Sequence, residues 1–320
     1  MVLEIGTILT GITLALIATC MTNVGVALQK KGLMEGLPEL TLKKGAGDFG
    51  TSFLKYFKNK SWAIGFFLGM AGWIPYVIAQ GFVGIVIVQP LQSVGLIVMV
   101  IFAHKVLNEK ISIPEISAIV LLISSTILIA FSGISSAHID LHEFVFPFFL
   151  FFIVVFSIIF TSILVGRKLK RENVSSLFKI VVAGLLFSLG GLFSNLLAQA
   201  FIDSSIRLIS PFGWAEVLFS IFWFDYFHLW VFFGFYGLIS FNFSGIIFQN
   251  NGMQKGKALV LWPIQNGINL IIPIIGGFLI FNQSISNLPI FLLAVILILV
   301  ATIILGKTQA EMGTLEKSNI

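Results

Sequence analysis

Long apolar stretches alternate with short polar gaps along the whole chain. Each stretch approaches the ~20 residues that an α-helix needs to cross the hydrocarbon core of a bilayer. Such segments must be helical, because lipid offers no hydrogen-bond partners to exposed backbone amides. The pattern predicts an all-α polytopic membrane protein with nine transmembrane helices, at residues 5–28, 62–80, 85–102, 116–134, 144–164, 180–202, 229–248, 258–281 and 288–305.

Positive charge is confined to every second gap between these stretches. Eighteen of the nineteen Lys and Arg residues lie in the first, third, fifth and seventh gaps and in the C-terminal tail, and Arg207 is the exception. Cytoplasmic loops collect basic residues. We therefore expect a multi-pass protein of the cell membrane with its N-terminus outside and its C-terminus in the cytoplasm. No basic residue precedes the first stretch, so we expect that stretch to remain as a helix rather than act as a secretory signal.

The composition excludes an ordinary soluble domain. Charged residues make up 10% of the chain, against about 25% in typical soluble domains. We expect the lipid bilayer as the main partner and no nucleic acid, since the net charge of +5 belongs to the predicted cytoplasmic edges. The single Cys20 excludes a disulfide within one chain. No nucleotide loop, catalytic triad or zinc motif is present, so we expect neither an enzyme nor a cofactor.

Residues 208–227 are apolar and aromatic but do not fit the charge pattern as a further crossing. They include Pro211, Glu216 and the interface-seeking residues Trp214 and Trp223. This favours a helix lying at the outer membrane surface, with a tenth transmembrane helix as the alternative.

The longest polar gap, 29–61, is expected to be a cytoplasmic loop. Its stretch 49–60 (FGTSFLKYFKNK) could lie on the inner leaflet with Phe53, Tyr56 and Phe57 in lipid. A solvated linker is the alternative.

The two halves of the chain repeat each other weakly, at an offset of 172 to 176 residues. Four pairs of landmarks occur in the same order: Thr22-Asn23 with Ser194-Asn195, 88–92 (VQPLQ) with 261–265 (LWPIQ), 107–109 (LNE) with 281–283 (FNQ), and 126–128 (TIL) with 302–304 (TII). One extra helix separates the two units, so the second must be inverted relative to the first, and the charge pattern requires the same inversion.

The predicted fold is therefore two inverted four-helix repeats joined by one linking helix, an architecture typical of secondary transporters. A duplicated membrane scaffold, receptor or assembly factor is the alternative. The expected units are residues 1–143, the linking helix and basic loop 144–171, the second repeat 172–306 and a cytoplasmic tail 307–320.

Several short motifs are similar to those of the drug/metabolite transporter superfamily, and within it the NIPA-type magnesium transporters. They are 23–33 (NVGVALQKKGL), 89–95 (QPLQSVG), 107–111 (LNEKI), 254–259 (QKGKAL) and 262–264 (WPI). The resemblance covers most of the chain except 49–60 and 203–228. It implies nine helices, an outside N-terminus and transport of Mg2+.

Buried amide side chains are the candidate substrate-binding residues. Such groups are costly in lipid, so they should face the interior of the bundle. Several recur at intervals of four or seven residues, which return to one helical face. The candidates are Asn23, Gln80, Gln92, Asn195, Gln199, Asn242, Gln265, Asn266 and Asn269. Hydrogen bonds that only hold the helices together are the alternative.

Prolines and glycines within the stretches have two expected effects. Pro90 and Pro263 are expected to break their helices and free backbone carbonyls for a cation or polar ligand. A kink in the helix that binds no ligand is the alternative. Gly65 and Gly69 favour a close contact between helices.

No charged residue falls in the central part of any predicted stretch. A proton-driven exporter of cations needs a carboxylate there, and Mg2+ prefers one or two carboxylates. A hydrated ion held by amides, or a neutral or zwitterionic metabolite, remains compatible with the pattern. We expect transport of a small solute by alternating access, with Mg2+ first, a metabolite exporter or exchanger second and a non-transport scaffold third. The metal ligands are left open. His138, Asp140 and His142 could gather divalent cations at the outer face, with an ordinary polar loop as the alternative. A homodimer is compatible with this layout.

Overall fold

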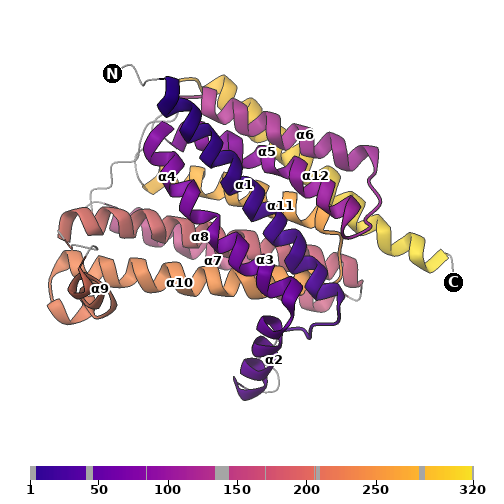
Figure 1. Ribbon diagram of the computed structural model, residues 1–320, viewed down its shortest axis with the longest axis horizontal. Helices are drawn as coiled ribbons and strands as arrows, with labels where there is room; N and C mark the ends of the chain where they lie inside the picture. The colour runs from indigo at the N-terminus through magenta and orange to yellow at the C-terminus, as the bar shows by residue number, and fades with distance from the viewer. Residues whose placement is uncertain are drawn as a thin grey trace.

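The computed structural model describes residues 5–40, 46–83, 85–133, 144–169, 171–204, 206, 210–280 and 285–318. Within these ranges the chain folds into helices that form one elongated bundle (Figure 1). In chain order they are α1 (Ile5–Met34), α2 (Ala46–Lys58), α3 (Lys60–Ala71), α4 (Trp73–Val83), α5 (Ile85–Lys105), α6 (Ile113–Phe131), α7 (Val145–Lys168), α8 (Glu172–Ser204), α9 (Pro211–Leu218), η1 (Ser220–Trp223), α10 (Tyr226–Met253), α11 (Ala258–Ile280) and α12 (Leu288–Ser318).

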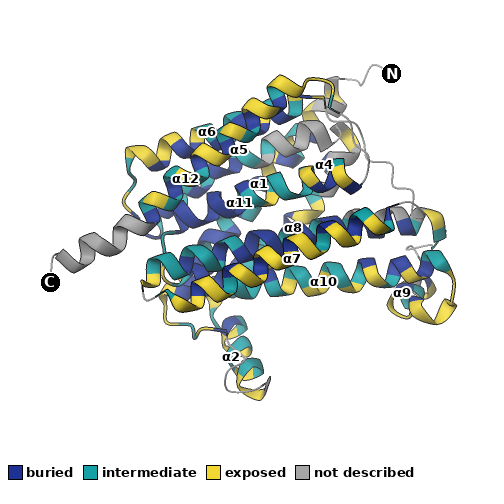
Figure 2. Cartoon of the chain, turned by 180° about the vertical axis from the view of Figure 1, so that it is seen from behind, coloured by how far each residue is buried: buried dark blue, intermediate teal, exposed yellow. Residues whose placement is uncertain are grey.

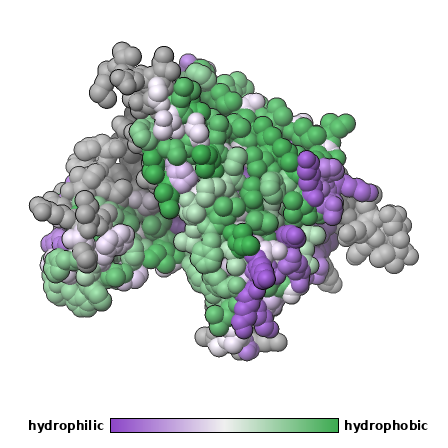
Figure 3. All heavy atoms as spheres, in the orientation of Figure 1, coloured by the Kyte–Doolittle hydropathy of each residue, from purple (hydrophilic) through white to green (hydrophobic). Residues whose placement is uncertain are grey.

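Seven of the helices in the described ranges are long and apolar enough to cross a membrane: α1, α6, α7, α8, α10, α11 and α12. Apolar side chains cover most of the visible face, and strongly hydrophilic ones gather mainly at its lower right (Figure 3). The prediction of an all-helical multi-pass membrane protein is confirmed. The other two expected crossings, 62–80 and 85–102, fall on α3 with α4 and on α5. The count of nine stays a prediction.

The segment 62–80 is not one uninterrupted helix, because α3 ends at Ala71 and α4 begins at Trp73. Pro75 has no amide hydrogen and cannot bond to the carbonyl of Ala71 four residues earlier. Gly72, at the break, also approaches α1 closely, and an added Cβ there would lie 3.1 Å from the carbonyl oxygen of Ala18.

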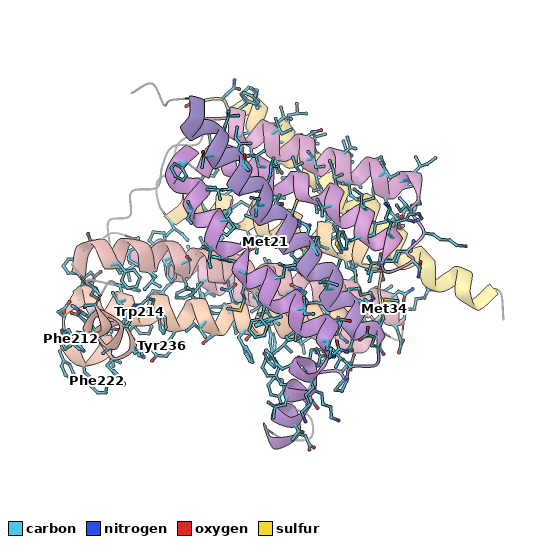
Figure 4. The ribbon with its side chains drawn as sticks, viewed as in Figure 1. Met21, Met34, Phe212, Trp214, Phe222 and Tyr236 are labelled. Carbon is cyan, nitrogen blue, oxygen red and sulfur yellow. The ribbon has the colours of Figure 1, made fainter. Side chains whose placement is uncertain are left out.

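Within the aromatic segment 208–227, the described residues 210–225 contain two short helices, and α10 begins at Tyr226. Helix α9 has eight residues and η1 has four, far below the ~20 residues of a crossing, so the segment does not form a tenth membrane-spanning helix. Figure 4 shows Phe212, Trp214 and Phe222 gathered at one end of the molecule beside Tyr236 of α10. We call this end of the bundle the aromatic end.

Residues 49–60 form most of α2 and the start of α3, and they pack on protein. Tyr56 is fully buried, and its hydroxyl donates a hydrogen bond to the carbonyl of Pro38 at 2.6 Å. The ring of Phe53 lies 5.3 Å from that of Phe243 in α10, and the ring of Phe57 lies 5.3 Å from that of Trp62. The expectation that Tyr56 enters lipid is wrong, because a phenol hydroxyl is more stable when a carbonyl satisfies it.

Helix pairs recur between the first and second halves of the chain. Helix α1 packs against α3, α4 and α5, while α8 packs against α10 and α11. Helix α6 packs along α12, and α7 packs on α8. Buried residues line the inward faces of these helices, and exposed ones line the outward faces (Figure 2).

Helices α1 and α3 cross with their backbones in contact. A Cβ added to Gly25 would lie 2.6 Å from the carbonyl oxygen of Gly65 and 2.9 Å from the amide of Gly69. The predicted close contact at Gly65 and Gly69 is confirmed, since no side chain fits at this crossing.

Candidate functional site

Asn23 lies where α1, α5 and α11 meet. Its side chain is almost completely buried, and its Oδ1 accepts a hydrogen bond from Trp262 Nε1 at 2.9 Å. Its Nδ2 donates to the carbonyl of Thr19 at 2.8 Å. A Cβ added to Gly95 of α5 would lie 2.3 Å from Asn23 Nδ2, so this glycine is needed for the approach. A predicted site residue of the first half therefore binds directly to a helix of the second half.

Gln265 lies one turn beyond Trp262 on α11 and pairs with Gln249 of α10. Gln265 Nε2 donates to Gln249 Oε1 at 2.9 Å, and both side chains are buried. Gln265 Oε1 is buried too, but it has no hydrogen-bond partner among the described residues. Leaving a buried acceptor unpaired costs about 1–3 kcal/mol, so a ligand or water that donates or coordinates here would be stabilised.

Asn250 adds a third bond between helices at the same level. Its Oδ1 accepts from Trp62 Nε1 of α3 at 3.0 Å, and its Nδ2 donates to Ile246 O of its own helix at 2.8 Å. We call Asn23, Trp262, Gln249, Gln265 and Asn250 the amide cluster.

Among the described residues, the other predicted amides make no hydrogen bond to this cluster. Asn242 donates to Leu238 O of its own helix at 2.8 Å. Asn269 is exposed, with Oδ1 3.5 Å from Ser188 Oγ. Asn266 is half-buried and makes no hydrogen bond with a described residue. The side chains of Gln80, Gln92, Asn195 and Gln199 lie outside the described part of the structure, although their helices are described.

The two expected helix-breaks are wrong as breaks. Helix α5 runs through Pro90, and α11 runs through Pro263 and Pro273. Pro263 is buried, and α11 continues through it. The proline still removes one donor, which leaves the Leu259 carbonyl without its usual helical partner.

A layer of charged residues lies between the amide cluster and the end of the bundle where α1 finishes and α11 begins. We call that end of the bundle the basic end, and Met34 is labelled there in Figure 4. Lys30 of α1 is buried, and its Nζ donates to Met253 O and, at 2.8 Å, to Gly256 O. Met253 is the last residue of α10, and Gly256 lies in the turn before α11, so a first-half lysine binds the second half at this point.

Glu109 caps the first turn of α11. Its two carboxylate oxygens accept hydrogen bonds from the amides of Ala258 and Leu259 at 2.8 and 2.9 Å, which a negative charge at a helix N-terminus favours. Burial raises the pKa of the Glu109 carboxyl above its ordinary value, against the lowering effects of these two bonds and of the charges on Lys30 and Lys257.

Lys257 forms the third contact of this layer. Its Nζ donates to Lys110 O at 2.9 Å and to Glu115 Oε1 at 3.2 Å. Glu115 is completely buried and also accepts from the amide of Ser112 at 2.7 Å, which caps α6. A hollow of about 540 Å³ adjoins the layer, lined by His104, Lys105, Asn108, Glu109 and Lys110.

The hydropathy and charge patterns assign no role to this charged layer. In the sequence, Lys30 indicates only topology, and Glu109 marks only the repeat. The motifs that contain them, 23–33 and 107–111, were the available signal. Nothing in the sequence indicates that these motifs meet across the two halves.

The amide cluster can hold a polar ligand through its amide groups and nearby backbone carbonyls. Within the described residues, no group of three or more His, Cys, Asp or Glu side chains could hold a metal ion. A dehydrated metal centre of carboxylates is therefore not present in that part of the chain. Amide oxygens are suited to a hydrated cation or to a neutral polar solute.

The fold and the buried polar groups define a polytopic membrane protein whose two halves meet around amide side chains. Residues 7–311 match the sequence profile described as "Magnesium transporter NIPA". The chain therefore belongs to the NIPA family of magnesium transporters, and it is a transporter rather than an enzyme. It is 22% identical over 319 residues to the "Probable magnesium transporter NIPA9" of Arabidopsis thaliana, a match that covers 96% of this chain and 85% of the relative. No solved structure matches the chain.

Proposed function

We propose that this protein carries Mg2+ across the cell membrane by alternating access, with the amide cluster as its binding site. The observation that carries the proposal is Gln265 Oε1, a buried acceptor with no partner among the described residues. It lies beside bonds that connect α1 with α11 and α10 with α11. A site between two halves can open to either side when the halves move.

The pairing of helices supports an inverted repeat. The contacts of α1 with α3, α4 and α5 correspond to those of α8 with α10 and α11. They match the sequence correspondence of the first stretch with the sixth, the second with the seventh and the third with the eighth. With the basic end at the cytoplasm, the same inversion accounts for the alternation of Lys and Arg between gaps.

The chemistry of the cluster favours a cation that keeps its water. Mg2+ gives up water reluctantly and is usually held by few protein ligands together with several waters. Gln265 Oε1 and the Leu259 carbonyl can accept from those waters. Asn266 lies beside Gln265 on α11 and has no other partner among the described residues, so we include it in the site. Gln80, Gln92, Asn195 and Gln199 remain predicted contributors.

A small neutral or zwitterionic metabolite is the second candidate. The observation that favours it is the lack of a carboxylate in the amide cluster, because amides bind uncharged polar groups without the desolvation cost of an ion.

Flux measurements in liposomes test the proposal. Purified protein would be reconstituted into liposomes that contain a Mg2+-sensitive dye. We expect Gln265→Leu to slow Mg2+ entry about tenfold or more, because an oxygen ligand is lost. Gln265→Glu keeps the shape and adds charge, so it should bind the ion more tightly and release it more slowly. Thr302→Val is the matched control, since among the described residues the Thr302 hydroxyl bonds only to Ile298 O of its own helix, at 2.8 Å.

The outcomes separate the candidates. Equal Mg2+ entry in Gln265→Leu and Thr302→Val would contradict the binding site. Flux of an uncharged solute without Mg2+ flux would favour the metabolite. No flux of either, with a stable complex of this chain and another membrane protein, would favour the scaffold.

A further inference from the structure

The polar contacts between the two halves are concentrated at the basic end. Lys30, from the first half, holds Met253 O and Gly256 O in the second half. Glu109, also from the first half, holds the amides that begin α11. Lys257, from the second half, reaches back to Lys110 O and Glu115. Three charged side chains thus join the same two structural parts at one level.

The chain that follows α1 reinforces this closure. The side chain of Asn251 of α10 binds both backbone polar groups of Leu40. Its Oδ1 accepts from the Leu40 amide at 2.9 Å, and its Nδ2 donates to the Leu40 carbonyl at 2.8 Å. Gln254 donates to Leu37 O at 3.1 Å. The first-half segment after α1 is therefore tied to the end of α10.

We infer that Lys30, Glu109 and Lys257 form a latch that closes the basic end of the transport pathway and must open in every transport cycle. The inference rests on the proposed alternating-access function. The latch lies between the amide cluster and the basic surface, because Lys30 follows Asn23 by two turns on α1 and Ala258 precedes Trp262 by one turn on α11. A solute leaving the cluster in that direction has to pass the latch.

The geometry distinguishes a latch from simple reinforcement of the fold. Each bond joins a charged side chain to the backbone or carboxylate of the opposite half, so relative movement of the halves breaks all of them together. By contrast, the exposed pair Lys255–Glu172, 2.7 Å apart, lies within the second half and can survive that movement. Along their length the halves also meet through α6 and α12, a helix pair that can remain packed while the basic end opens.

Thiol labelling tests the latch without any substrate. The reporter is Val26→Cys in a Cys20→Ser background. Val26 is buried on α1, one turn farther from the basic end than Lys30. An impermeant maleimide would be added to the basic side of proteoliposomes of known orientation. We expect slow labelling in the parent protein and labelling about tenfold faster or more in Lys30→Met and Glu109→Ala, because charged hydrogen bonds are lost.

Matched variants keep the result interpretable. Glu172→Gln removes the exposed ion pair with Lys255 inside the second half and should label like the parent. Lys257→Met is made together with Glu115→Gln, because Lys257→Met alone would leave the buried Glu115 carboxylate without its cation. The double variant should label faster than the parent. Gel filtration identifies variants that fail to fold. Unchanged labelling in the folded double variant and in Glu109→Ala would overturn the latch.

Reversible cross-linking provides a second readout. In the double variant Lys110→Cys and Lys257→Cys, a short linker that reacts with both thiols and is cleaved by reduction should hold the basic end closed. Mg2+ flux should stop when the linker is attached and return after reduction. Continued flux in the cross-linked protein would overturn the latch. Faster labelling without Mg2+ flux in any variant would instead leave the latch in place and contradict the proposed substrate.

Discussion

The two ends of this helix bundle use their polar residues differently. At the basic end, Lys30, Glu109 and Lys257 join one half of the chain to the other. At the aromatic end, the buried His228 contacts Glu216 at 3.0 Å and also Asp225, and all three belong to the second half.

The apolar residues of the two ends differ as well. The aromatic end exposes large side chains, including Phe212, Phe222 and Phe224, which suits a membrane surface. The basic end instead buries Lys30, Glu109 and Glu115 beneath exposed lysines such as Lys105 and Lys110. The basic end therefore joins the two halves, whereas the aromatic end is bonded within the second half and exposes large apolar side chains.

The largest expected difference between the ends concerns Glu115. This fully buried carboxylate caps α6 and binds Lys257. Glu115→Ala should lower the free energy of unfolding by about 3 kcal/mol or more, because a buried pair loses one partner together with a helix cap. Reversible unfolding in mixed micelles, followed by circular dichroism, measures this.

The control for that prediction is Glu172→Ala. Its carboxylate is exposed and pairs with Lys255, so its loss should cost less than about 1 kcal/mol. Equal losses in the two variants would remove the distinction between buried and exposed pairs.

The second effect is a pH dependence at the basic end. Burial raises the pKa of Glu109, whose charged neighbours are Lys30 and Lys257, with His104 Nδ1 3.3 Å from its carbonyl. The stabilising contribution of Glu109 is fully present below the ordinary carboxyl pKa and is lost as the pH rises through the raised value. The closed basic end should therefore be more stable at lower pH, and Val26→Cys should label more slowly there.

Glu109→Gln should remove that part of the pH profile, because the amide does not titrate. A profile of the same shape in Glu109→Gln would assign the titration to another group.

A smaller effect is expected from Glu216→Gln at the aromatic end. His228 keeps its contact with Asp225, so the loss should be about 1 kcal/mol. The fluorescence of Trp223 should report it, since its ring stacks on His228 at a centroid distance of 5.7 Å. Labelling at the basic end should stay unchanged, and a change there would show that the two ends are coupled.

The smallest effect is expected for Phe224→Asn. This side chain is 89% exposed, and its φ of 53° suits asparagine better than phenylalanine. The free energy of unfolding in detergent should change by less than about 0.5 kcal/mol. A larger loss would mean that Phe224 packs on protein, in conflict with an exposed aromatic end.

Much of the fold could be predicted because lipid imposes a simple rule. Every predicted stretch coincides with a helix, or with a pair of helices in the case of α3 and α4. Boundaries were less predictable. Helix α8 begins at Glu172 rather than near residue 180, and α12 continues through the expected tail to Ser318. Polar helix ends outside the membrane carry no hydrophobic signal, so hydropathy does not locate them.

The candidate site was predictable only in part. Cost in lipid correctly places Asn23 and Gln265 inside the bundle. The same argument also predicts that Asn242 and Asn269 face the interior of the bundle. However, Asn242 satisfies its amide on its own helix, and Asn269 is exposed. Which partner an amide finds depends on the neighbouring helix, and the spacing of residues along one helix does not contain that information.

Composition and hydropathy are enough to predict a bundle of membrane helices with amides inside, because the free energy of leaving water depends mainly on each segment's own residues. Which motifs meet depends instead on how the helices pack. Residues 23–33 and 107–111 were separate signals in the sequence, yet Lys30 and Glu109 close around the same turn before α11. Contacts of that kind depend on how helices cross, and the crossing is decided by packing at small residues such as Gly25 and Gly95.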